Sequence, residues 1–387
     1  MTALPAPAVV ESSAGAIPGA ASAARMHVAA LVPDGTLLVG PLNGYHHETY
    51  AFVLPAEDGS GLQTWWKCRY PREGLLRFDP RPFASEDALL GALQGRVTRI
   101  PVLAEYKGVP IYSFIEGRTL GEVSPIGTPL SGRHLGQLGG LFRELVSIDA
   151  DEIGVVVGPR AVGRPTGRED DSADFLTRLI GFTEHHVYRR HVQRYGSLFS
   201  ELGVHGGGLD RLRSEAARLK PRPFALVQGD LHRENFIVDA QGDLWTIDWE
   251  LAMIGDPLYD LATHLHLMRY QAKEADRVAG IWWRAVGDLR PECVKGWETD
   301  LEVLLAYKRA QSVYTDVIRA ALALNQPGPG REPNLRRLPL VAWRVQQALV
   351  AARRPLGLEA VPTLRQVMSV YVRWFRTHAP AVTASAP

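Results

Sequence analysis

Two carboxylates and one amide could together bind a metal ion and act on a hydroxyl group. Asp230 and Asn235 stand five residues apart in a polar segment, and Asp248 follows further along the chain. Carboxylate and amide oxygens are suitable ligands for a hard divalent cation such as Mg²⁺. We therefore expect phosphoryl transfer, in which Asp230 orients an attacking hydroxyl while Asn235 and Asp248 hold the metal ion that bridges the nucleotide phosphates.

A β-hairpin is expected to position two of these residues. Two mainly apolar runs, Phe236–Val238 and Leu244–Ile247, flank the turn-like tetrad Ala240–Asp243. A hairpin centred on this tetrad places Asn235 directly opposite Asp248, whether its loop has two or four residues. Directly opposed residues hold their Cβ atoms roughly 4.5–5.5 Å apart. Each residue alone would be an ordinary turn or surface residue, but the spacing of the set favours a metal site.

The segment Gln228–Asn235 (QGDLHREN), followed by Ile247–Glu250 (IDWE), resembles the catalytic loop and metal-binding segment of the aminoglycoside phosphotransferase and choline kinase superfamily. The resemblance implies an α+β, bilobal, protein-kinase-like fold with a small antiparallel-sheet lobe containing one helix and a larger, mainly helical lobe. It also implies that Asp230 is the catalytic aspartate, with Asn235 and Asp248 as metal ligands. The segment begins with glutamine, where the family usually has a bracing histidine.

Composition bounds the class of protein. A chain of 387 residues is long enough for two lobes with separate cores, and its nine tryptophans indicate a folded globular protein. The formal net charge of +1 predicts neither nucleic-acid nor membrane partners. Two cysteines, Cys68 and Cys293, form no disulfide framework and fit a reducing cytosol. No apolar run approaches the ~20 residues of a membrane span, so we expect a cytoplasmic protein.

Four regions are expected along the chain. Residues 1–25 form a disordered Ala/Pro/Ser-rich tail that lacks the basic start and apolar centre of a signal peptide. Residues 26–117 form the nucleotide-binding N-lobe, and residues 118–380 form the catalytic and acceptor-binding C-lobe. Residues 381–387 form a second tail.

The N-lobe is expected to contain a sheet that carries a phosphate-binding lysine. Lys67 lies in the third strand-like run, where the resemblance implies contact with the α and β phosphates of ATP or GTP. An edge-strand lysine that points at water is the alternative interpretation. The five runs are Thr36–Val39, Glu48–Leu54, Leu62–Arg69, Ile100–Glu105 and Pro110–Ile115.

One helix of the N-lobe is expected to carry the partner of that lysine. Ser85 caps the predicted helix Glu86–Leu93. Glu86, in its first turn, is the expected ion-pair partner of Lys67. Asp87 is the competing candidate, and an acid in a first turn also complements the helix dipole without any further role.

Two further segments resemble nucleotide-binding parts of the family. The loop Gly40–His47 lies where a phosphate-covering loop is expected, and Gly44 would let backbone N–H groups approach the phosphates. A plain hairpin connection is equally consistent with this loop. The segment Tyr112–Leu120 resembles the interlobe hinge, although a simple turn at Gly117 is the alternative. The hinge residues expected to contact the purine are Phe114, Ile115 and Glu116.

The C-lobe is expected to be helical. Asp256, followed by proline, predicts a helix start, and the resemblance implies that Asp260 accepts backbone N–H groups beneath the catalytic loop. The C-terminal segment 331–387 contains nine arginines and only two acids. It favours a neutral or acidic acceptor, unless the arginines are simply solvated. The expected helices are Gly132–Ile148, one or two within 173–200, Asp256–Tyr270 and 296–324.

These features predict a nucleotide- and Mg²⁺-dependent O-phosphotransferase. It would move the γ-phosphate of ATP or GTP to a hydroxyl of a small natural product or metabolite. One alternative acceptor is a Ser or Thr hydroxyl in a precursor peptide of a lanthipeptide-type pathway. Another alternative, a catalytically weak pseudokinase that acts as a scaffold, is supported by Gln228 and the thin glycine loop. The acceptor, the nucleotide and the oligomeric state stay open.

Overall fold

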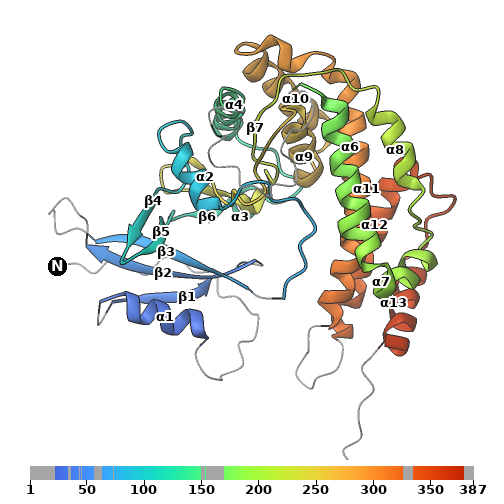
Figure 1. The fold of residues 1–387 in the computed structure, drawn as a ribbon, viewed down its shortest axis with the longest axis horizontal. Helices are drawn as coiled ribbons and strands as arrows, with labels where there is room; N and C mark the ends of the chain where they lie inside the picture. Colours follow the sequence, from blue (N-terminus) through green and yellow to red (C-terminus); the bar gives the residue numbers. More distant parts are fainter. Residues whose placement is uncertain are drawn as a thin grey trace, which may run out of the picture.

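The computed structural model describes residues 22–33, 36–42, 44, 46–55, 63–72, 74–149, 153, 170–325 and 334–378. Within this part, a small lobe built on a β-sheet lies beside a larger helical lobe, as predicted (Figure 1). Most of the two predicted tails lies outside the described residues. One helix, α1 (Ala23–Leu31), begins inside the segment assigned to the first tail and was not predicted.

A five-stranded antiparallel sheet forms the small lobe, with the strand order β1-β2-β3-β5-β4. All five predicted strands are present, with boundaries shifted by a few residues. Helix α1 packs Val28 against Tyr50, Phe52 and Ile111 of the sheet, and this small core holds the lobe together. The strands are β1 (Leu38–Leu42), β2 (His47–Pro55), β3 (Gln63–Pro71), β4 (Leu103–Tyr106) and β5 (Val109–Ser113).

The helix predicted after Ser85 is confirmed as α2 (Glu86–Leu93). The Ser85 hydroxyl accepts a hydrogen bond from the Ala88 N–H at 3.0 Å, which satisfies one of the free donors of the first turn. Leu89, Leu90 and Leu93 are buried on one face of α2. Capping and apolar spacing thus define this helix in the way the sequence predicts.

The chain enters the large lobe at Gly117. A Cβ atom at this position would lie 2.3 Å from the Val238 carbonyl oxygen, so only glycine fits. The short strand β6 (Arg118–Thr119) follows and pairs with the hairpin of the large lobe. Helix α3 (Leu120–Val123) then begins with a capping box at Thr119.

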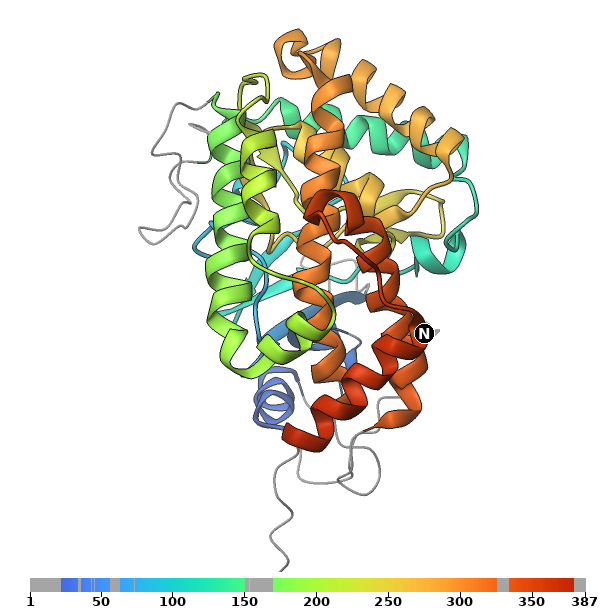
Figure 2. The same ribbon diagram turned by 90° about the vertical axis from the view of Figure 1, so that its right-hand side faces the viewer.

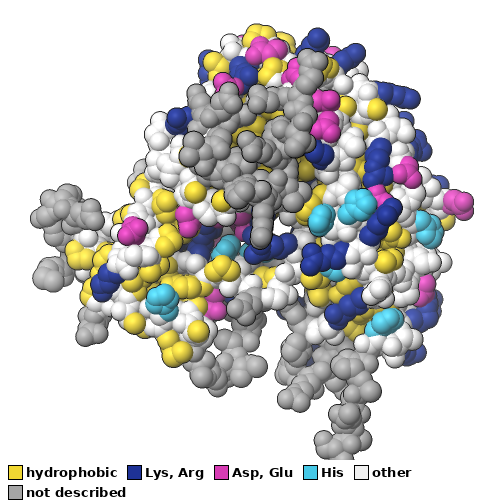
Figure 3. All heavy atoms as spheres, viewed as in Figure 1, with side chains coloured by type: hydrophobic (Ala, Val, Ile, Leu, Met, Phe, Trp, Pro, Cys, Tyr) yellow, Lys and Arg dark blue, Asp and Glu magenta, His cyan; other side chains and the backbone are white. Residues whose placement is uncertain are grey.

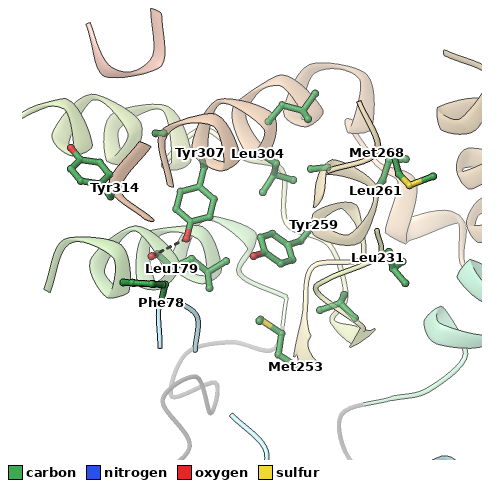
Figure 4. Close-up of a cluster of buried hydrophobic side chains, with 14 of the residues drawn as sticks. Phe78, Leu179, Leu231, Met253, Tyr259, Leu261, Met268, Leu304, Tyr307 and Tyr314 are labelled. Carbon is green, nitrogen blue, oxygen red and sulfur yellow. Dashed lines mark hydrogen bonds between the residues drawn. The ribbon is translucent and has the colours of Figure 1, made fainter. Parts of the chain in front are cut away.

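The connection between β3 and α2 makes a second contact with the large lobe. Phe78, in this connection, is 3% exposed and joins the core of the large lobe. Its ring lies 5.1 Å from the Arg319 guanidinium and 6.2 Å from the His191 ring. Figure 4 shows Phe78 beside Leu179 and Tyr307, inside the helical lobe. The small lobe is therefore anchored by a side chain as well as by the crossing at Gly117.

Helices build the large lobe around α11, which runs through its middle (Figure 2). Two regular helices and a π-helical turn (Thr183–Arg189) occupy the segment predicted as one or two helices. No helix of the described residues is long and apolar enough to cross a membrane. The principal helices are α4 (Gly132–Val146), α6 (Ser172–Phe182), α7 (Arg190–Glu201), α8 (Gly208–Ala216), α9 (Leu258–Met268), α10 (Ala272–Gly287), α11 (Trp297–Asn325), α12 (Leu338–Leu356) and α13 (Leu364–His378).

The helix expected at Asp256–Tyr270 is shorter than predicted, because α9 begins at Leu258. Asp256 accepts the Leu258 N–H at 2.9 Å, as a capping residue does, but its carboxylate also pairs with the buried Arg222 at 2.7 Å. Arg222 makes a second ion pair with Asp300 at 2.7 Å. This buried network fixes the start of α9 against α11.

Four short strands hold the loops that carry the candidate site. Strands β7 (Ala225–Val227) and β10 (Met253–Gly255) pair with each other. Strands β8 (Phe236–Val238) and β9 (Leu244–Thr246) form the predicted hairpin.

The register of this hairpin differs from the prediction by one residue. Val238 faces Leu244, and the Ile247 N–H donates to the Asn235 carbonyl at 2.9 Å. Asn235 therefore lies opposite Ile247, and the prediction that it lies directly opposite Asp248 is wrong.

The reason for the shift is the length of the hairpin loop. The Asp239 N–H donates to the Asp243 carbonyl at 3.0 Å, which leaves a three-residue loop, 240–242. Gly242 has φ +78°, the left-handed conformation that closes such a loop. An odd loop length moves the facing pairs by one position relative to loops of two or four residues.

Candidate active site

Strand β7 leads into the loop that carries Asp230, the residue predicted to be catalytic. The strand is buried, and Gly229 follows it with φ +79°. A Cβ atom at Gly229 would lie 2.6 Å from the Leu251 carbonyl oxygen, so the turn requires glycine. Leu231 is fully buried beyond the turn. Asp230 is thus held between two fixed points and remains partly exposed.

Two neighbours orient the carboxylate of Asp230. The Asn235 amide donates to Oδ2 of Asp230 at 3.0 Å and to its backbone carbonyl at 3.0 Å. Nε2 of His232 lies 3.4 Å from the same Oδ2. Burial lowers the pKa of His232, but the hydrogen bond and charge of Asp230 outweigh it and leave the pKa raised. Both contacts use Oδ2, which leaves Oδ1 to accept a proton from a hydroxyl group.

Asp248 is buried with an oxygen that lacks a partner. Its backbone has φ +60°, and no hydrogen-bond donor of the described residues reaches Oδ1. Burial raises the pKa of Asp248 to about 6, with further raising by Glu86 and Asp230 and lowering by Arg69 and Lys67. A buried carboxylate oxygen without a hydrogen-bond partner indicates a site where a ligand binds.

The residues present fit a magnesium ion. The structure brings the charges of Asp230 and Asp248 close enough to influence each other, and Asn235 contacts Asp230. Among the described residues, no group of three His, Cys, Asp or Glu side chains gathers as a metal cluster. Mg²⁺ commonly uses one or two carboxylates and completes its shell with water and substrate phosphates. Asp248 and Asn235 would hold such an ion, and its charge would stabilise the phosphates.

Gln228 joins the loop that carries Asp230 to the segment that carries Asp248. Its side-chain oxygen accepts the Asp230 N–H at 2.7 Å, and its side-chain nitrogen donates to the Asp248 carbonyl at 2.6 Å. The amide therefore serves as donor and acceptor at once. Glutamine at this position keeps the bracing contacts that the family resemblance implied for histidine.

Asp260 supports the same loop from below, as the resemblance implied. Its two oxygens accept the backbone N–H groups of Gln228 and Gly229 at 2.8 and 2.7 Å. Burial raises the pKa of Asp260 to about 7, although these hydrogen bonds and the Lys308 charge lower it.

A histidine fixes the far side of the catalytic loop. Nδ1 of His264 lies 2.9 Å from the Leu231 carbonyl, and Nε2 lies 2.9 Å from the Tyr270 hydroxyl. Burial lowers the pKa of His264 to about 4, so the ring is neutral at pH 7. His266 instead contacts Ser312, which agrees with the expected divergence of these two side chains.

Glu86 pairs with a different residue from the one expected. Nη2 of Arg69 lies 2.5 Å from Oε2 of Glu86, and the Trp249 N–H donates to Oε1 at 3.0 Å. Lys67 makes no ion pair with Glu86, so that prediction is wrong. Lys67 and Arg69 share one face of β3, and the longer, forked arginine reaches α2.

Lys67 therefore remains available for another anion. Burial lowers the pKa of its ammonium to about 8, with a further lowering by Arg69, whereas the charges of Glu86 and Asp248 raise it. Nucleotide phosphates would satisfy this charge, and the role predicted for Lys67 remains a proposal.

A cluster around Glu250 was not predicted. Arg81 pairs with Glu250 at 2.6 Å, and His46 and His47 lie 3.5 and 4.0 Å from its carboxylate. Burial, followed by the charge of Asp248, raises the pKa of Glu250 to about 7. This cluster joins the end of the glycine loop to the metal-binding segment. The sequence contained Glu250 within the IDWE motif, but no spacing linked it to the histidines.

The structure shows where the other residues predicted to contact the nucleotide lie. Gly44 lies in the loop before β2, and its neighbours Asn43 and Tyr45 lie outside the described residues. The Phe114 N–H donates to the Trp65 carbonyl at 3.0 Å. The hinge residues Phe114, Ile115 and Glu116 follow β5, and their contact with a purine remains a proposal.

Residues 44–297 match the model of the phosphotransferase enzyme family (APH). The match covers well over half of the chain, and the chain therefore belongs to this family. It is a phosphotransferase that has an alcohol group as acceptor.

Two solved structures share the fold, and a third is similar at a lower TM-score. A choline kinase from Streptococcus pneumoniae superposes with a TM-score of 0.50 at 14% identity, over 86% of this chain and 98% of that one. An ethanolamine kinase from Plasmodium vivax gives 0.50 at 12%, over 88% and 87% of the two chains. A macrolide 2'-phosphotransferase from Brachybacterium faecium gives 0.47 at 18%, over 88% and 99%. A comparison with curated protein sequences finds no match.

Proposed function

We propose that this protein transfers the γ-phosphate of ATP or GTP to a hydroxyl group of a small natural product or metabolite. The observation that carries the proposal is the arrangement of Asp230 and Asp248 around the Gln228 amide. That arrangement fixes a partly exposed carboxylate beside a buried carboxylate that has an unsatisfied oxygen.

Residues of the chain would have three roles in the reaction. Asp230 would accept the proton of the acceptor hydroxyl. The hydroxyl oxygen would form a bond to the γ-phosphorus while the bond between the γ-phosphorus and the β-phosphate oxygen breaks. Lys67 would bind the α and β phosphates. Gln228 and Asp260 would keep Asp230 in position. A magnesium ion held by Asn235 and Asp248 would neutralise negative charge on the phosphates.

The test is incubation of the protein with labelled ATP and GTP against a panel of hydroxylated antibiotics, metabolites and peptides, read as the mass gain of one phosphoryl group. Asp230→Asn should lower turnover by at least ~10²-fold while nucleotide binding stays nearly intact. Asp288→Asn, at an exposed position on the large lobe, is the matched control. Unchanged turnover in Asp230→Asn would refute the role of this residue.

A peptide hydroxyl is the second candidate acceptor, favoured by a basic surface on the large lobe. Lys, Arg and His side chains lie along the border of the lobes and over the helical lobe (Figure 3). Such a surface suits neutral or acidic acceptors better than polycations. In the remaining alternative, a pseudokinase, the protein would bind nucleotide but transfer no phosphate to any member of the panel.

A further inference from the structure

The outer face of α12 carries an exposed apolar stripe. Leu340, Trp343 and Val350 are 53%, 43% and 54% exposed. Together with Gln347 and Arg354 they follow a spacing of three and four residues, which places all five on one side of the helix. The stripe is about 21 Å long, given a rise of 1.5 Å per residue. Its width and spacing suit contact with a second helix.

A basic hollow lies at the C-terminal end of this stripe. The cavity has a volume of about 510 Å³, and its walls include Val350 and three arginines, Arg211, Arg353 and Arg354. Arg211 has one weak carboxylate contact, with Glu215 at 3.4 Å. Within the described residues, Arg353 and Arg354 have no carboxylate partner. The hollow therefore offers apolar contact and uncompensated positive charge together.

Paired charges lie beyond the other end of the stripe. Arg344 follows Trp343 on α12, and its charge, with those of Arg319 and Arg269, lowers the pKa of Asp316, which burial raises. Arg319 makes ion pairs with Asp316 at 3.9 Å and with Asp79 at 3.7 Å. Arg319 is also close enough to His46, at the end of the glycine loop, to lower the pKa of that histidine. Arginines thus lie between α12 and the end of the glycine loop, and Arg319 among them is balanced by Asp79 and Asp316.

We propose that the outer face of α12, with its basic hollow, docks an acidic, amphipathic helix of the polypeptide that bears the acceptor hydroxyl. This inference rests on the proposed phosphotransferase function. Leucine-like side chains of the partner would cover Leu340, Trp343 and Val350. Its carboxylates would pair with Arg353 and Arg354 in the hollow.

Charge complementarity distinguishes this partner from other occupants. The chain segments 1–21, 326–333 and 379–387 together contain only two acids, Glu11 and Glu332, so none of them supplies an acidic helix. A second copy, paired antiparallel through α12, would bring arginines at the two ends of the stripe toward each other, which is unfavourable.

The test uses the full chain without nucleotide and a fluorescein-labelled helical peptide. The peptide has leucines at alternating spacings of three and four residues and glutamates elsewhere, and a matched peptide has lysines in place of the glutamates. Fluorescence anisotropy should show binding of the glutamate peptide only. Trp343→Ala and the double variant Arg353→Glu/Arg354→Glu should each weaken binding by at least ~10-fold.

Trp283→Ala is the matched control, because Trp283 is 47% exposed on α10 and lies outside the stripe. Its binding should equal that of the wild type, and circular dichroism should confirm that all variants fold. Equal binding of the lysine peptide, or an equal loss in Trp283→Ala, would overturn the proposal. So would a Trp343-dependent dimer in sedimentation, or Trp343-dependent binding to phosphatidylglycerol vesicles in place of the peptide.

A second measurement separates docking from catalysis. A serine-containing extension joined to the glutamate peptide should be phosphorylated with a KM at least ~10-fold lower than the free extension, and Trp343→Ala should remove this advantage without changing kcat. Peptide binding without phosphoryl transfer to this serine or to any member of the acceptor panel would refute the proposed function alone. Phosphoryl transfer with equal KM values for joined and free extensions would refute the docking surface alone.

Discussion

Gln228 donates a hydrogen bond from Nε2 to the backbone carbonyl of Asp248 at 2.6 Å. The same side chain accepts the Asp230 N–H through its oxygen. The carboxylates proposed for catalysis and for metal binding are therefore positioned by one neutral amide. Glutamine carries no titratable proton, so this brace keeps both of its contacts at any moderate pH.

Gln228→His should preserve activity at high pH and lose it at low pH. A neutral imidazole has one donor and one acceptor nitrogen, as the amide requires, whereas a protonated imidazole has two donors. With an ordinary pKa of about 6.5, the variant should approach wild-type kcat above pH 7.5 and fall below it as the pH decreases. Gln228→Leu, which has neither group, should lose activity at every pH. A pH profile of kcat for the three proteins tests this, and a uniformly inactive Gln228→His would show that the position does more than brace.

Asp248→Ala should abolish metal-dependent nucleotide binding. The substitution removes the buried oxygen that lacks a partner and with it the proposed magnesium ligand. Calorimetric titration with ATP, with and without Mg²⁺, measures the effect, and Asp276→Ala on the surface of α10 serves as the control. Undiminished affinity for Mg·ATP in Asp248→Ala would remove this residue from the metal site.

Substitution of Arg69 should lower the stability of the fold, whereas substitution of Lys67 should weaken nucleotide binding. Arg69→Met leaves the buried Glu86 carboxylate without its ion pair and should destabilise the fold by ~3 kcal/mol. Lys67→Met should leave the unfolding temperature nearly unchanged and weaken nucleotide binding. Thermal unfolding and ATP titration of both variants, with exposed Arg72→Met as the control, check the assignment. The reverse pattern would restore Lys67 as the structural partner of Glu86.

Asp260 should make stability depend on pH in a defined direction. Its pKa is raised by burial to about 7, so the folded protein binds this proton more tightly than the unfolded chain. The stability contributed is fully present below the ordinary carboxyl pKa of about 3.9 and is lost as the pH rises through 7. The unfolding temperature of the wild type, relative to Asp260→Asn, should therefore fall between pH 5 and pH 8. A constant difference across this range would contradict the raised pKa.

The sequence was sufficient to predict a helix or strand where its local signals agree with the tertiary structure. Ser85 and the leucines of Glu86–Leu93 define α2 by capping and spacing, and both signals act within one helix. The same holds for the five strands of the small lobe. The set formed by Asp230, Asn235 and Asp248 was also recognisable, because its residue types and spacing occur together in one short segment.

Features that depend on contacts between distant segments could not be predicted. The hairpin register depends on the hydrogen bonds that Asp239 makes with Asp243, Gln241 and Gly242, which close a loop of odd length. The choice of Arg69 over Lys67 depends on how far each side chain reaches toward α2. Glu250 meets His46 and His47 only because two lobes pack together. None of these relationships leaves a periodic or spaced signal in one stretch of sequence.

Phe78 and Gly117 together limit how the two lobes can move. The chain passes between the lobes at Gly117, and Phe78 is inserted in the helical core. The lobes also meet where the leucines of α2 join the same core, where the Trp249 N–H donates to Glu86, and where Arg81 pairs with Glu250. Opening of the space between the lobes would have to break or shift these contacts together, and shortening Phe78 to alanine would remove one of them.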